Sequence, residues 1–108
     1  MSGVRSEQVL AQVRGERIKQ HHKWGRQEHP DGTGDTYLNR TAVEQAKTQC
    51  EFERESTPQG PSWRAILDEE VREAFIETDR AKLREELIQV AAVAVAWIED
   101  LDGRPVAK

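Results

Sequence analysis

The chain is poor in the features that mark secreted, membrane and nucleic-acid-binding proteins. Its single cysteine, Cys50, cannot form an internal disulfide, which fits a reducing compartment. No candidate base lies at a suitable spacing from Cys50, so we expect a packing residue and not a nucleophile. The longest apolar run, residues 90–98, is far shorter than the roughly 20 residues of a membrane span, and the N-terminal residues lack a signal-peptide core. The net charge of -4, without a long basic run, argues against binding to nucleic acid polymers. We therefore expect a cytoplasmic protein with neither a membrane nor a nucleic acid polymer as partner.

The apolar residues that are present are unevenly distributed. The 108 residues suit a single domain, 1–108. Leu, Ile, Val and Phe together make up about 20% of the chain, a content close to that of disordered proteins. The last third nevertheless holds a dense apolar block, which a monomer of this size has difficulty covering. The composition therefore predicts self-association.

Helical periodicity and its interruptions predict four helices and no strand. The segment after the first helix is rich in Gly, Pro and Asp and is expected to be a loop, ending near residue 35. Ser62 and Asp79 are candidate N-caps for the third and fourth helices. The expected helices cover residues 5–24, 37–55, 62–77 and 80–101. We therefore expect an all-α fold, a four-helix bundle completed by a second copy of the chain.

The centre of the last expected helix, residues 87–98, is apolar on nearly all sides. The alternation of valine and alanine over residues 93–95 also suits a strand, but the length, the alanine content and the charged flanks favour a helix. A helix that is apolar all round is normally buried all round. We therefore expect this helix to be the most buried one in the chain.

Acidic residues recur at helical spacing just before this apolar block. Residues three and four apart share one face of a helix, so Glu70, Glu73 and Glu77 form one stripe. Glu86 and Gln89 repeat the spacing on the next helix. If the two pairs converge, their carboxylates repel one another unless a cation lies between them, and hard oxygen ligands favour Mg²⁺ or Mn²⁺. The alternative is a solvated acidic face, and convergence requires a tilt or a register shift that the spacing does not determine.

The acidic pattern resembles that of a known family. The arrangement EExxE at residues 69–73, followed by EExxQ at 85–89, is similar to the motif of the MazG-like all-α nucleoside triphosphate pyrophosphohydrolases, ExxE followed by ExxD on adjacent helices. The upstream segment ERIKQHHKWGRQEHPDG, residues 16–32, also resembles small MazG-like proteins, often those of phages or actinobacteria. The resemblance covers roughly residues 14–102 and is weakest over 36–60.

The resemblance implies a helical homodimer, or a dimer of dimers, that uses Mg²⁺ to cleave a nucleoside or deoxynucleoside triphosphate into a monophosphate and pyrophosphate. By motif position, Glu69 would orient or deprotonate the attacking water. The metal ligands would be Glu70, Glu73, Glu86 and Gln89.

Gln89 departs from the family pattern, which has aspartate at this position. Its amide oxygen can bind a metal but carries no charge, so the site would have three carboxylates where four are expected. This departure keeps a second function open, a MazG-like module that binds nucleotides or a protein partner with weak or no catalysis. A purely structural assembly protein is the third alternative, and it would show no stabilisation by metal.

The upstream loop is the expected nucleotide-binding segment. Trp24 is a candidate for stacking on a base and Lys23 for facing phosphates, although a tryptophan at a helix end is also typical of a core anchor. The three histidines lack zinc-ligand spacing. The full set of candidate nucleotide-binding residues is Gln20, Lys23, Trp24, Gln27 and His29.

Overall fold

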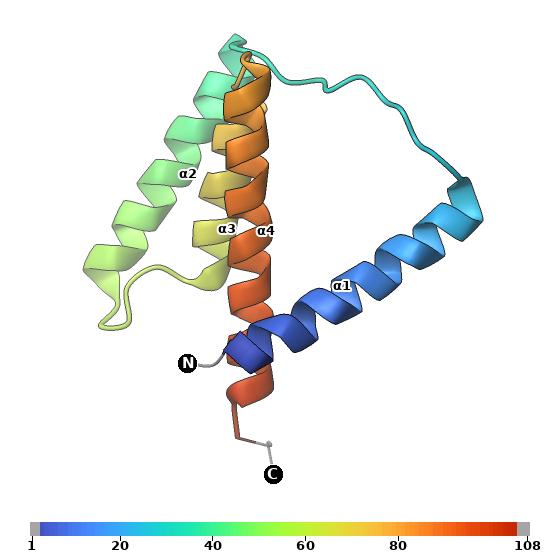
Figure 1. Ribbon diagram of the computed structural model, residues 1–108. Helices are drawn as coiled ribbons and strands as arrows, with labels where there is room; N and C mark the ends of the chain where they lie inside the picture. The colour runs from blue at the N-terminus through green and yellow to red at the C-terminus, as the bar shows by residue number, and fades with distance from the viewer. Residues whose placement is uncertain (1–2, 106–108) are drawn as a thin grey trace. The chain divides into compact units, whose positions relative to one another are not determined.

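The computed structural model describes residues 3–105, and these form four helices without a strand (Figure 1). The all-α prediction is therefore confirmed, and the predicted helix limits hold to within about two residues. The third helix ends two residues earlier than predicted. The helices are α1 (Gly3–Trp24), α2 (Tyr37–Ser56), α3 (Trp63–Phe75) and α4 (Arg80–Gly103).

The chain divides into two compact units. The central unit is Gly32–Ala94, and the terminal unit combines Met1–Asp31 with Val95–Lys108. The central unit contains α2, α3 and the first part of α4, whereas the terminal unit contains α1 and the last part of α4. Among residues 3–105, no helix is both long and apolar enough to cross a membrane.

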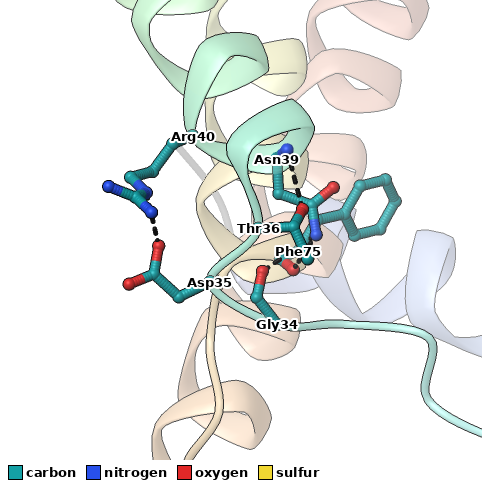
Figure 2. Close-up of polar contacts among 6 residues, drawn as sticks. All are labelled: Gly34, Asp35, Thr36, Asn39, Arg40 and Phe75. Carbon is teal, nitrogen blue, oxygen red and sulfur yellow. Dashed lines mark hydrogen bonds and ion pairs between the residues drawn. The ribbon is translucent and has the colours of Figure 1, made fainter.

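Antiparallel pairing of α2 and α3 forms the core of the central unit. Near the start of α2, the Asn39 side-chain amide donates a hydrogen bond to the Phe75 carbonyl at the end of α3, at 3.2 Å (Figure 2). Near the end of α2, the Cys50 thiol donates to the Ala65 carbonyl at the start of α3, at 3.3 Å. The side chains buried along this pair are small, as close helix packing requires. They are Val43, Ala46, Cys50, Ala65 and Ala74.

Side-chain caps fix where the helices of the central unit begin. Thr36 accepts a hydrogen bond from the Asn39 amide at 3.1 Å and begins α2 (Figure 2). Ser62 accepts one from the Ala65 amide at 3.1 Å, and Asp79 accepts one from the Lys82 amide at 3.0 Å. The two predicted N-caps, Ser62 and Asp79, are confirmed.

The prediction that the last helix is the most buried one is wrong for a single chain. No residue of α4, which lies wholly within the described part of the chain, is buried. Leu87 and Ile88 keep 49% and 56% of their surface exposed. One chain of this size offers too little apolar surface to cover a helix that is apolar on every side.

In the terminal unit, the start of α1 is tied to the end of α4. The Ser6 hydroxyl donates a hydrogen bond to a Glu99 carboxylate oxygen at 2.7 Å, and Val9 is buried. Trp24, at the other end of α1, is 63% exposed, so its alternative interpretation as a core anchor is wrong. Trp63 and Trp97, in α3 and α4, are half-buried.

Candidate metal centre

Three glutamates of the central unit converge, as the acidic spacing suggested. Glu70 and Glu73 lie one turn apart on α3, and Glu86 lies in the second turn of α4, beyond the short connection at residues 76–79. One carboxylate oxygen from each lies within 4.8 Å of the others, and all three residues are half-buried. The interpretation as a wholly solvated acidic face is therefore wrong for these three side chains.

The cluster disfavours its own full ionisation. Partial burial raises the pKa of Glu70 above its ordinary value, and the charges of Glu86 and Glu69 raise it further. Burial likewise raises the pKa of Glu73, the charges of Glu70, Glu69 and Glu86 raise it further, and the charge of Lys47 opposes this rise. Without a bound cation, the folded chain therefore holds mutually repelling carboxylates that retain protons more readily than isolated ones.

Two of the carboxylate oxygens in this cluster lack a hydrogen-bond partner. Oε2 of Glu70 and Oε2 of Glu86 are both inaccessible, and neither accepts a hydrogen bond from the described residues. A buried acceptor without a partner costs roughly 1–3 kcal/mol. A cation bound between the carboxylates would offset this cost and the repulsion together.

The donor set fits a small hard cation. Mg²⁺ takes oxygen ligands at about 2.0–2.1 Å, so two ligands of one ion lie no more than about 4 Å apart. The oxygens in this cluster, within 4.8 Å of one another, approach that spacing before any side chain rotates. Carboxylate ligands with neither sulfur nor imidazole among them favour Mg²⁺ or Mn²⁺ over zinc.

Glu69, the candidate for orienting water, is half-buried and precedes Glu70 on α3. Its carboxylate lies near Cys50 of α2: burial, and then the Glu69 charge, raise the pKa of the Cys50 thiol to about 11. A buried thiol with this pKa stays protonated at neutral pH and is a poor nucleophile. Cys50 is therefore a packing residue that adjoins the acidic face.

Gln89, the fourth expected ligand, lies one turn beyond Glu86 on α4 and is exposed. Glu77, which shares the stripe of Glu70 and Glu73 in the sequence, follows the end of α3 and is half-buried. It is not among the three converging carboxylates.

The candidate nucleotide-binding residues are all exposed and belong to the terminal unit. The Lys23 ammonium lies 4.9 Å from the centroid of the Trp24 ring, a cation–π contact. Gln20 accepts a hydrogen bond from Arg17 at 2.5 Å. Trp24, Gln27 and His29 line an open hollow of about 490 Å³ together with Arg26 and Glu28. These residues therefore belong to the terminal unit, whereas the three glutamates belong to the central unit.

Lys47 is a residue whose charge acts on the acidic cluster and that the sequence did not reveal. Its place in the sequence, on a weakly amphipathic helix outside every motif, gave no signal. Its effect on the pKa of Glu73 follows from the packing of α2 on α3.

No family model, curated protein or solved structure matches the chain. The resemblance to MazG-like proteins therefore stays a prediction.

Proposed function

We propose that this protein is a Mg²⁺-dependent nucleotide pyrophosphohydrolase, which cleaves a nucleoside or deoxynucleoside triphosphate to a monophosphate and pyrophosphate. The observation that carries the proposal is the convergence of Glu70, Glu73 and Glu86 on one space, within 4.8 Å. The acidic motifs shared with the MazG-like family supply the choice of substrate. Mn²⁺ is expected to substitute for Mg²⁺, since both prefer oxygen ligands.

The chemistry needs no protein nucleophile. A bound divalent cation would polarise the phosphoanhydride and acidify water. The three glutamates would hold that cation, and Glu69 would accept the proton of the attacking water. The water oxygen forms a bond to the α-phosphorus while the bond from this phosphorus to the bridging oxygen breaks, and pyrophosphate leaves. Trp24 and its neighbours in the terminal unit would contact the nucleoside.

A second copy of the chain belongs to this proposal. The support is α4, which has no buried residue and exposes Leu87 and Ile88. Pairing of two such helices in a homodimer or a dimer of dimers would remove this apolar surface from water. The expected cytoplasmic location stays a prediction from the single cysteine.

The test is product release from a panel of ribo- and deoxynucleoside triphosphates, with Mg²⁺, with Mn²⁺, and with a chelator. Monophosphate and pyrophosphate in equal amounts, lost on chelation, are the expected result. Diphosphate and orthophosphate as products would overturn the assignment of the cleaved bond. No turnover from folded protein, across the whole panel, would contradict the enzyme.

Exposed Gln89 favours one alternative, a module that binds nucleotides with weak or no catalysis. It offers no charge where a fourth carboxylate is expected, so the site should hold divalent cations less tightly than one with four. The variant Gln89→Asp separates the two functions. Activity that appears only in this variant would identify the natural protein as a binding module, whereas a modest change in an already active protein would support the enzyme.

A further inference from the structure

The side-chain amide of Asn39 joins three segments of the central unit. Its Nδ2 donates one hydrogen bond to the Gly34 carbonyl at 2.9 Å and another to the Phe75 carbonyl at 3.2 Å (Figure 2). The Gly34 amide donates to the same Phe75 carbonyl at 2.9 Å. Asn39 lies in the first turn of α2, Gly34 in the loop before α2, and Phe75 at the end of α3. The half-buried side chain of Asn39 therefore holds the three segments together at one point.

Asparagine suits this position because of its donors. A primary amide carries two N–H donors on one nitrogen, and here each of them has a carbonyl acceptor. Ionised aspartate has nearly the same shape but only acceptors, so it would face two carbonyl oxygens without a hydrogen between them. Asparagine is also a weak helix former. The hydrogen bonds, and not helix propensity, therefore explain this residue at the start of α2.

These hydrogen bonds satisfy the end of α3. The last carbonyls of a helix have no acceptor role within the helix itself, and the Phe75 carbonyl accepts from Gly34 and Asn39 in its place. The sequence predicts a helix to residue 77, whereas α3 ends at Phe75. The connection of residues 76–79 begins directly after this point and leads into α4.

The end of α3 bears on the approach of the helices that carry the candidate metal ligands. Glu73 lies in the last turn of α3, two residues before Phe75, and Glu86 lies in the second turn of α4. Because the connection between the two helices is short, a change in the last turn of α3 also moves the start of α4. Mg²⁺ demands near-ideal octahedral geometry, so the convergence of the carboxylates within 4.8 Å tolerates little of such movement.

We infer that Asn39 is a positioning residue of the candidate metal centre. It fixes the last turn of α3 and, through the connection at residues 76–79, holds Glu86 in register with the two glutamates of α3. The inference rests on the proposed function, since the register matters only if the three glutamates hold a cation. Asn39 needs no contact with the cation or the substrate for this role, because it acts through the backbone that carries the ligands.

The experiment measures binding of Mg²⁺ to the full chain by titration calorimetry, together with Mg²⁺-dependent release of pyrophosphate. Asn39→Ala removes both side-chain hydrogen bonds. Asn39→Asp removes the same donors, but an acidic residue in the first turn favours α2, so this variant separates the donors from helix stability. The matched control is Ser62→Ala, which removes the N-cap at the opposite end of α3, where Ser62 accepts from the Ala65 amide at 3.1 Å. Thermal unfolding measures the Tm of each variant.

We expect Asn39→Ala and Asn39→Asp each to weaken Mg²⁺ binding about tenfold, at the lower end of the effect of groups that orient metal ligands. Ser62→Ala should lower the Tm without changing the affinity for Mg²⁺, because the start of α3 carries none of the three glutamates. Saturating Mg²⁺ should restore the kcat of Asn39→Ala to near that of the wild type, since all three carboxylates are still present.

Three outcomes would overturn the inference. Unchanged Mg²⁺ affinity in both Asn39 variants would show that the amide only caps α3, and the proposed function would stand without it. An equal loss of affinity in Ser62→Ala would trace the effect to the stability of α3 and not to its last turn. If the wild type binds no Mg²⁺, there is no site for Asn39 to position, and the proposed function fails as well.

Discussion

The central and terminal units use helices of similar length in different ways. In the central unit, α2 has 20 residues and buries Val43, Ala46 and Cys50. In the terminal unit, α1 has 22 residues, and among its described side chains only Val9 is buried. The approach of α4 to α3 brings three carboxylates together, and the pKa values of Glu70 and Glu73 are raised there. The candidate nucleotide-binding residues of the terminal unit are all exposed. The candidate metal site of the central unit is therefore assembled by helix packing, whereas the candidate nucleotide-binding residues of the terminal unit lie on an exposed surface.

The largest effect is expected from removing a carboxylate of the cluster. Glu70→Gln, Glu73→Gln and Glu86→Gln should each lower Mg²⁺-dependent turnover by roughly 100-fold or more, because each takes a charged ligand from the cation. Initial rates of pyrophosphate release measure this.

The matched control for these variants is Glu85→Gln, which changes the exposed neighbour of Glu86 on the same helix. It should retain nearly full activity. Equal activity of the cluster variants and this control would show that the cluster is a structural feature without a catalytic role.

The next effect concerns the exposed apolar face of α4. Ile88→Glu should weaken self-association by roughly tenfold or more, because burying a charge in an apolar contact is costly. Analytical ultracentrifugation over a range of concentrations measures the dissociation constant. Glu85→Lys, also on α4, is a surface control for the change of charge. A wild-type chain that stays monomeric at all concentrations would contradict the expected second copy.

A smaller effect is expected in the terminal unit. Trp24→Ala should raise the KM for the nucleotide about tenfold, since stacking of a base on an aromatic ring contributes roughly 1–3 kcal/mol, and should leave Mg²⁺ binding unchanged. Tyr37→Ala, at another exposed aromatic residue, is the control. If Trp24→Ala leaves KM unaltered, the terminal unit does not recognise the base, and the contrast between the two units loses its functional meaning.

The smallest effect is a dependence of stability on pH. Glu70 and Glu73 have a raised pKa in the folded chain, above the ordinary value of 4.5, so the folded state binds protons more tightly than the unfolded state. Their contribution to the free energy of unfolding is therefore fully present below about pH 4.5 and is lost as the pH rises through the raised pKa values.

Thermal unfolding from pH 4 to pH 8, without metal, measures this effect by comparing the wild type with Glu73→Gln. The Tm of the wild type should fall relative to that of Glu73→Gln as the pH rises. Mg²⁺ should reverse the trend, because it binds the ionised carboxylates. Parallel curves for the two proteins would show that the cluster carries no repulsion.

Local signals in the sequence predicted the secondary structure well. Ser62 and Asp79 cap their helices as their residue types indicate, because capping depends on a side chain and on backbone amides two or three residues away. The stripe of Glu70 and Glu73 follows from the helical repeat alone. Non-local features were predicted less well: α4 was expected to be buried, yet burial depends on what surrounds a helix and not on its own composition.

The sequence by itself determined the four helices, their caps and the helical faces that carry the acidic residues, since all of these depend on neighbours within about one turn. Only the tertiary structure decided that Glu86 meets Glu70 and Glu73, and that Cys50 lies near Glu69. Each of these contacts joins two helices, so it depends on their register and direction. Hydrogen bonds such as that from Asn39 to Phe75 help to set this register for α2 and α3, and no single segment of the chain encodes it.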